Sequence, residues 1–100
     1  MNFYRKYMEE TIHAIACLTK NNYNAIISIK RIRDFYEINS ADHSKIAFYW
    51  RNLDTLDEIG VLKRINAKSP KLYRIFNYFK FFELLHDTYI HQVNPNGLVI

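Results

Sequence analysis

Three side chains that could ligate a metal recur at one spacing near the start of the chain. Glu9, His13 and Cys17 stand four residues apart, which places them on one face of a helix. A zinc site would need a fourth ligand and usually a second cysteine, whereas Cys17 is the single cysteine of the sequence. We therefore expect no metal centre, and we expect Cys17 to be a small buried side chain.

A second group that could do chemistry is acidic and consists of Asp54, Asp57 and Glu58. Carboxylates can hold the metal of a nuclease, but acids this close together on a helix diverge, and no lysine or histidine pairs with them in an obvious way. The two glycines stand alone, so a glycine-rich phosphate loop is absent from the sequence. These residues do not indicate an enzyme, and we expect no cofactor and no small-molecule ligand.

The basic residues are concentrated in one part of the chain. The net charge is +4, and residues 61–80 hold six lysines and arginines without a single acid. A smaller basic cluster is formed by Lys30, Arg31 and Arg33. Concentrated positive charge is typical of nucleic-acid binding, although a solvated basic surface has the same pattern.

Length and composition predict one folded domain in a reducing compartment. The chain has 100 residues, of which 49% are apolar, and only two are glycine and two proline. A single cysteine is typical of a cytoplasmic protein. No apolar run reaches the roughly 20 residues that span a bilayer, so we expect no membrane association.

Hydrophobic periodicity and turn residues predict four helices and one hairpin. Ser28 is a candidate N-cap and Gly60 a candidate helix end. The predicted elements are a helix at 5–20, a short extended stretch at 25–27, helices at 29–37 and 42–59, strands at 61–65 and 72–76, and a last helix at 77–92.

The third predicted helix separates apolar from polar residues on a helical wheel. The predicted buried stripe consists of Ile46, Tyr49, Trp50, Leu53 and Leu56. The opposite face carries Ser44, Phe48 and Arg51, flanked by Lys45 and Asn52.

The segment Leu53-x-x-Leu56-x-x-x-Gly60-Val61-Leu62-Lys63-Arg64 resembles the end of the recognition helix and the first wing strand of a winged helix-turn-helix domain. The order of the predicted elements over residues 8–76 also resembles this family. The resemblance implies a mostly helical α+β fold in a single domain over 1–100, with a helix-turn-helix at 29–59, a basic β-hairpin wing at 61–76 and a C-terminal dimerisation helix at 77–92. The composition is similar to small transcriptional regulators of archaea and their viruses, which would act in the host cytoplasm.

The family implies a sequence-specific transcriptional regulator that binds double-stranded DNA with its third helix in the major groove. An arginine or asparagine there can read guanine or adenine edges, while the wing contacts phosphates. Residues expected to contact bases are Ser44, Lys45, Phe48, Arg51 and Asn52. Residues expected to contact the DNA backbone are Lys30, Arg31, Lys63, Lys68, Lys71 and Arg74.

Some of these side chains could have structural roles without contacting DNA. Arg51 and Asn52 could be ordinary helix surface, and Phe48 could make a satellite core contact. The domain could also serve protein–protein contact within a transcription or replication assembly.

The ends of the chain are rich in aromatic residues. Half the circumference of the last predicted helix is apolar, which is wider than one small core requires. An exposed patch of this kind usually marks an interface, and a two-fold dimer suits a regulator that reads two half-sites. We therefore expect a homodimer through the N- and C-terminal helices, although the last helix could simply close the core. The expected interface residues are Tyr4, Tyr7, Tyr78, Phe79, Phe81, Phe82, Leu85 and Tyr89.

Overall fold

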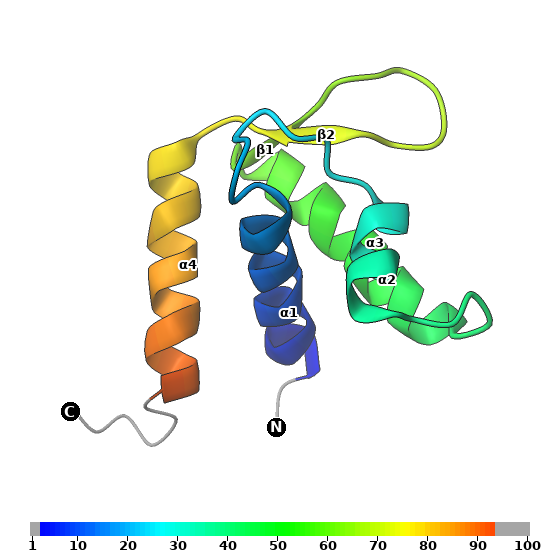
Figure 1. The fold of residues 1–100 in the computed structure, drawn as a ribbon, viewed down its shortest axis with the longest axis horizontal. Helices are drawn as coiled ribbons and strands as arrows, with labels where there is room; N and C mark the ends of the chain where they lie inside the picture. The colour runs from blue at the N-terminus through cyan, green and yellow to red at the C-terminus, as the bar shows by residue number, and fades with distance from the viewer. Residues whose placement is uncertain (1–2, 94–100) are drawn as a thin grey trace.

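The computed structural model describes residues 3–93, and the side chains of residues 5–89 among them. Within that range, four helices and one hairpin follow one another as the sequence predicts (Figure 1). The elements are α1 (Phe3–Leu18), α2 (Ile29–Tyr36), α3 (His43–Glu58), β1 (Leu62–Arg64), β2 (Tyr73–Ile75) and α4 (Tyr78–Val93). The predicted mostly helical α+β class is confirmed.

Capping residues set the boundaries of the two middle helices. The Ser28 Oγ accepts a hydrogen bond from the N–H of Arg31 at 3.2 Å, which caps α2 as predicted. Asp42 caps α3 in the same way, because its Oδ1 accepts from the N–H of Lys45 at 3.2 Å. Gly60 follows α3 with a φ of 81°, in the left-handed region that glycine adopts freely. Local chemistry therefore fixes where α2 begins and where α3 begins and ends.

The central helix of the fold is α1. It packs against α2, α3 and α4, and in Figure 1 it stands between α4 on one side and α3 with α2 on the other. Its own buried side chains are Thr11, Ile12, Ala14 and Ile15. The other elements contribute Ile27, Ile32, Tyr49, Leu53, Leu56, Val61, Leu62, Tyr73, Ile75 and Phe81 to the same core.

The hairpin is antiparallel, with Lys63 opposite Arg74 in its register. A third segment joins it, because the N–H of Ile27 donates to the carbonyl of Tyr73 at 2.8 Å and the N–H of Tyr73 donates to the carbonyl of Ile27 at 2.9 Å. The short extended stretch predicted at 25–27 is therefore a one-residue bridge. This bridge ties the linker between α1 and α2 to the hairpin.

The buried stripe of α3 differs from the predicted one. Tyr49, Leu53 and Leu56 are buried as predicted, but Trp50 is 47% exposed and Ile46 only half-buried. Asn52, at 6% exposure, is buried instead. The helix is thus rotated so that Asn52 faces α1 and Trp50 faces the tip of the hairpin.

Candidate nucleic-acid interface

The first nine residues of α3, His43 to Arg51, present a short, largely polar surface to solvent. Ser44, Ala47 and Arg51 are exposed, and their spacing of three and four residues puts them on one face of the helix. Lys45 lies beside them and is half-buried. The Arg51 guanidinium carbon lies 6.0 Å from the centre of the Phe48 ring. No acidic residue occurs between His43 and Arg51, and the nearest acid before this stretch is the exposed cap residue Asp42.

Asn52 does not belong to that surface. Its Nδ2 donates a hydrogen bond to the Thr11 Oγ1 at 3.2 Å, and the Thr11 hydroxyl in turn donates to the carbonyl of Tyr7 at 2.7 Å. The prediction that Asn52 contacts a base is wrong, because the side chain joins α3 to α1 inside the core. Its spacing of three residues from Tyr49 and four from Leu56 indicates the buried face.

Phe48 also turns toward α1. Its ring stacks on Tyr7 with centroids 4.6 Å apart and an angle of 16° between the planes. Tyr7 in addition makes an edge contact with Tyr49. The satellite core contact left open for Phe48 therefore replaces the predicted base contact. The Tyr7 ring is half-buried in this stack, and its place in a dimer interface stays a prediction, while the side chain of Tyr4 lies outside the described residues.

The outward face of the hairpin is basic. Lys63 and Arg74 are both exposed and stand directly opposite each other across the two strands. Lys68 is exposed in the loop that connects the strands. As predicted, these three side chains are accessible to a ligand.

Asn66 gives the connecting loop a defined shape. Its Nδ2 donates to the carbonyls of Lys68 at 2.6 Å and Pro70 at 2.7 Å, and its Oδ1 accepts from the N–H of Leu72 at 2.9 Å. One side chain thus bridges both sides of the loop. Lys68 is presented from a supported backbone rather than from an unconstrained one.

Lys71 has a different role from the one predicted. Its Nζ lies 3.1 Å from both carboxylate oxygens of Asp54 and 4.2 Å from the centre of the Trp50 ring. The Tyr73 hydroxyl donates to the same carboxylate at 2.7 Å. The Lys71 charge is neutralised within the protein, which contradicts its assignment to the DNA backbone. We name these residues, Trp50, Asp54, Lys71 and Tyr73, the Asp54 cluster.

The contacts within the Asp54 cluster shift the pKa values of the Asp54 carboxyl and the Tyr73 hydroxyl. Burial tends to raise the pKa of the Asp54 carboxyl, but hydrogen bonds from Tyr73 and Lys71, with the charges of Lys71 and Arg64, outweigh burial and lower it. Burial and the hydrogen bond to Asp54 raise the pKa of the Tyr73 hydroxyl. Asp54 is therefore ionised and Tyr73 neutral at neutral pH. The sequence places Asp54 only in an acidic patch and does not reveal these partners.

The basic cluster on α2 is partly accessible. Lys30 and Arg31 are exposed in the first turn of α2, where they are accessible for the predicted contacts to the DNA backbone. Lys30 Nζ lies 2.9 Å from a carboxylate oxygen of Asp34 one turn later. An exposed pair of this kind is weak and can open to exchange partners.

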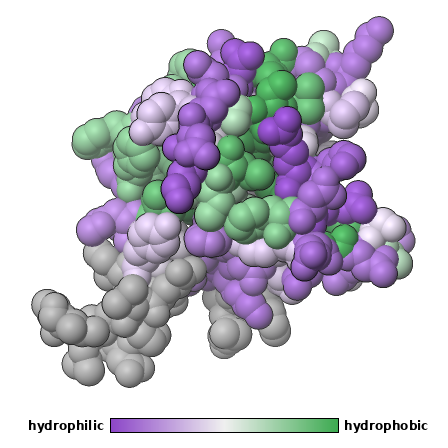
Figure 2. Space-filling model, in the orientation of Figure 1, coloured by the Kyte–Doolittle hydropathy of each residue, from purple (hydrophilic) through white to green (hydrophobic). Residues whose placement is uncertain are grey.

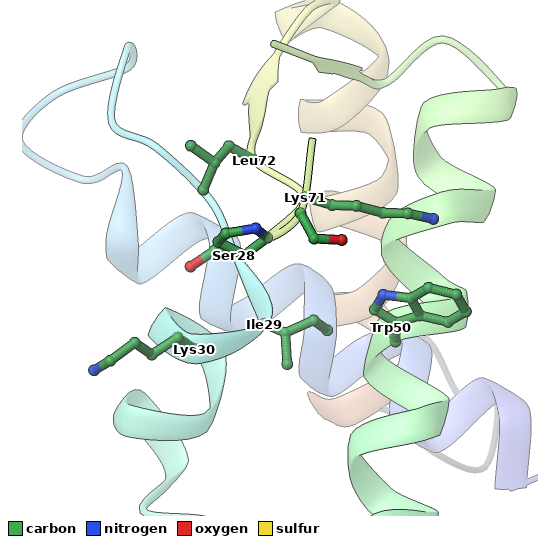
Figure 3. A pocket seen from close by; sticks show the side chains of 8 residues that line it. Ser28, Ile29, Lys30, Trp50, Lys71 and Leu72 are labelled. Carbon is green, nitrogen blue, oxygen red and sulfur yellow. The ribbon is translucent and has the colours of Figure 1, made fainter. Parts of the chain in front are cut away.

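A pocket of about 400 Å³ separates the start of α2 from α3 and the hairpin loop (Figure 3). Its apolar walls include Ile29, Trp50 and Leu72. Figure 3 shows the Lys71 side chain extending over Trp50, while Lys30 points the opposite way. The two ammonium groups do not converge on one point, so the pocket lacks the arrangement of an anion site.

The predicted dimer residues of α4 separate into two sets. Phe81 is 1% exposed and belongs to the core, so its assignment to an interface is wrong. Tyr78 and Leu85 are half-buried and pack against the same core. Phe79, Phe82 and Tyr89 are 74%, 48% and 43% exposed. Figure 2 shows hydrophobic side chains gathered over the upper part of α4, at the left of the view.

The potential metal ligands of α1 do not form a site. Cys17 is exposed, contrary to expectation, and its Sγ lies 3.7 Å from the Nε2 of His13. Among the described residues, no three histidine, cysteine, aspartate or glutamate side chains gather where they could hold a metal ion. In the same part of the chain, no helix has both the length and the apolar character to cross a membrane.

Comparison with known proteins yields no relative. No protein-family model matches the chain, and no curated protein or solved structure matches it significantly.

Proposed function

We propose that this protein is a winged helix-turn-helix regulator of transcription that binds double-stranded DNA. In this proposal α2 and α3 form the helix-turn-helix, and the β1–β2 hairpin forms the wing. The order of these elements, the bridge at Ile27 and the turn at Gly60 support the assignment. α3 then enters the major groove with the segment that ends at Arg51, whose side chain is exposed.

The observation that carries the proposal is the pair formed by Lys63 and Arg74. Like charges directly opposite each other destabilise an antiparallel sheet, and this sheet has two strands of three residues each. A bound polyanion removes the repulsion and turns both charges into favourable contacts. A protein–protein module gives the pair no comparable role, so we favour DNA as the partner.

The exposed face of α3 and the basic residues of the hairpin and α2 contact different parts of the DNA in this proposal. Arg51 reads a base edge, with Ser44 and Lys45 beside it, because only the groove exposes sequence information. Phosphates are contacted from the hairpin and from the start of α2. The residues proposed to contact phosphates are Lys63, Lys68, Arg74, Lys30 and Arg31.

We further propose that the protein acts as a homodimer through α4. Phe79, Phe82, His86 and Tyr89 are exposed and follow one another at intervals of three, four and three residues. This is the spacing of a coiled-coil seam, which a second copy of the same helix can cover. A two-fold dimer would place two α3 helices on half-sites about one DNA turn apart.

Selection of bound sequences from random duplex DNA tests the proposed function. We expect enrichment of a motif with two related half-sites, and an affinity that falls as salt concentration rises. The affinity of the enriched duplex is then measured against a scrambled duplex of the same composition. Failure to retain any duplex DNA at low salt would overturn the proposal.

A further inference from the structure

The outward face of the hairpin carries apolar side chains beside its charges. Side chains alternate along a strand, so Ile65 shares the face of Lys63, and Phe76 shares the face of Arg74. Ile65 is 38% exposed and Phe76 is 61% exposed. Phe76 thus presents a largely exposed aromatic ring on the basic face of the hairpin.

The backbone of Phe76 is fixed, which excludes a flexible connection as the reason for its exposure. Its N–H donates to the carbonyl of Val61 at 2.8 Å, one step beyond the paired strands. The next residue, Asn77, caps α4 because its Oδ1 accepts from the N–H of Lys80 at 3.0 Å. The ring is therefore presented outward from two ordered elements.

Packing against the first turn of α4 does not account for the exposure of the Phe76 ring either. An apolar residue just before an N-cap often packs against the fourth helical residue, which is Phe81 here. Phe81 is buried at 1% exposure in the core, whereas most of Phe76 remains in solvent. Packing at the start of α4 therefore leaves most of the Phe76 side chain accessible.

Phe76 lines a hollow of about 520 Å³ between the hairpin, the linker before α2 and the start of α4. Three cations, Lys63, Arg64 and Arg74, line the same hollow, and no acidic residue does. The Tyr78 ring borders it and is braced by an edge contact with Tyr23, at 5.3 Å between centroids. The volume is within the range of small-ligand sites.

The chemistry of the hollow selects a ligand that is both planar and anionic. Lys63 Nζ lies over the Phe76 ring, 5.4 Å from its centre, so a cation and an aromatic ring in contact with each other are presented together at the hollow. An apolar peptide would leave the cations unpaired, and a bare phosphate would leave the ring uncovered. A nucleotide satisfies both, because its base stacks on aromatic rings and its phosphate pairs with lysine or arginine.

We propose that this hollow holds an unpaired nucleotide of the bound DNA, with its base stacked on Phe76 and its phosphate at Lys63 and Arg74. The inference rests on the proposed function, since it assumes that DNA lies along the hairpin. It adds a preference for DNA with a single-stranded end, because a paired base hides both of its faces in the duplex. The hairpin would then discriminate DNA structure, while α3 reads sequence.

The test compares two DNA ligands and three proteins by fluorescence anisotropy. The ligands are a short blunt duplex and the same duplex with a single-stranded thymidine extension. We expect the wild-type protein to bind the extended duplex roughly tenfold more tightly, which corresponds to the stacking of one base. Phe76→Leu keeps an apolar side chain but removes the aromatic face, so the preference should disappear. Phe76→Tyr keeps the face and should retain it.

Two controls separate the possible failures. Lys68→Ala, in the connecting loop outside the hollow, should weaken both ligands equally. Circular dichroism and thermal unfolding show whether each variant folds, and the exposure of Phe76 predicts little change. Equal binding of both ligands by the wild type, or a preference that survives in Phe76→Leu, would overturn the inference and leave duplex binding intact. Absence of binding to either ligand would overturn the proposed function as well.

Discussion

Lys63 and Arg74 face each other across the two-stranded sheet with both charges exposed. The neighbouring core residues Leu62, Tyr73 and Ile75 are buried, and their packing holds the strands together despite this repulsion. Residues selected for stability alone would place a neutral or opposite charge at one of the two positions. Function and stability should therefore respond in opposite directions when the pair is changed.

The variant Arg74→Thr tests this opposition, because Lys63 also contacts the Phe76 ring. We expect the free energy of unfolding to rise by roughly 0.2–1 kcal/mol, because a like-charge contact is replaced by a good strand former. Affinity for duplex DNA should fall, and the slope of log affinity against log salt should decrease by about one. Urea unfolding and salt-dependent anisotropy measure the two effects. Lys63→Thr should lose DNA affinity alike, and a stable Arg74→Thr variant with unchanged DNA affinity would contradict the role of the pair.

Arg51 should determine the preference for the selected site and contribute little to the affinity for scrambled DNA. Arg51→Ala is expected to weaken the selected site by roughly 1–3 kcal/mol and to relax specificity at one base position. Arg51→Lys is the matched control, because it keeps the charge but lacks the planar pair of donors. It should preserve binding to scrambled DNA and still lose specificity. Equal weakening of selected and scrambled DNA by Arg51→Ala would show that α3 is oriented differently.

Lys68 and Lys71 lie three residues apart but should differ in function. Lys68 is exposed, so Lys68→Ala should lower the salt slope of DNA binding by about one. Lys71 is held by Asp54 and lies over Trp50, so Lys71→Ala should leave the salt slope unchanged. It should instead lower the free energy of unfolding by about 1 kcal/mol, through a lost hydrogen bond to a half-exposed acid. A lower salt slope with unchanged stability in Lys71→Ala would mean that the Asp54 cluster opens when DNA binds.

Through the Asp54 cluster, Asp54 should make the free energy of unfolding sensitive to acid. Its pKa in the folded protein lies below the ordinary value of 3.8, so its contribution to stability is complete above that value. The contribution is lost as the pH falls through the lower, folded pKa. Thermal unfolding between neutral pH and pH of about 2 should show this loss in the wild type and a smaller one in Asp54→Asn. An identical pH dependence in both proteins would exclude Asp54 as a contributor.

Local signals in the sequence are sufficient to predict the elements. Ser28 and Gly60 mark a helix start and a helix end through their own backbone chemistry, and both are found where predicted. The hairpin follows in the same way from alternating residues on either side of a polar turn. These features depend on neighbours within a few residues, which the sequence displays directly.

The candidate site is less predictable, because it depends on partners that are distant in sequence. The helical wheel ranks Trp50 as buried and Asn52 as exposed from hydropathy alone. Thr11, 41 residues away from Asn52, supplies the hydrogen bond that permits an amide in the core. Lys71, from the hairpin, covers Trp50. Neither partner is marked by a motif, so the orientation of α3 is evident only from the structure.

The proposed dimer contact is the row of exposed side chains Phe79, Phe82, His86 and Tyr89 on α4. A glutamate at Phe79, which is 74% exposed, would introduce an unpaired charge into the proposed helix–helix contact. We expect Phe79→Glu to raise the dimer dissociation constant by roughly thirtyfold or more, equivalent to about 2 kcal/mol, as for the loss of a central aromatic anchor. Helical circular dichroism should be unchanged, and operator binding should weaken because two half-sites are no longer engaged together. Asp87→Ala, on the polar face of α4, is the matched control and should remain dimeric. Phe81→Glu is unsuitable, since Phe81 is buried in the core and the variant would test folding instead. Sedimentation of the wild-type chain as a monomer at tens of micromolar would exclude the dimer, and with it the two-half-site mode of DNA recognition.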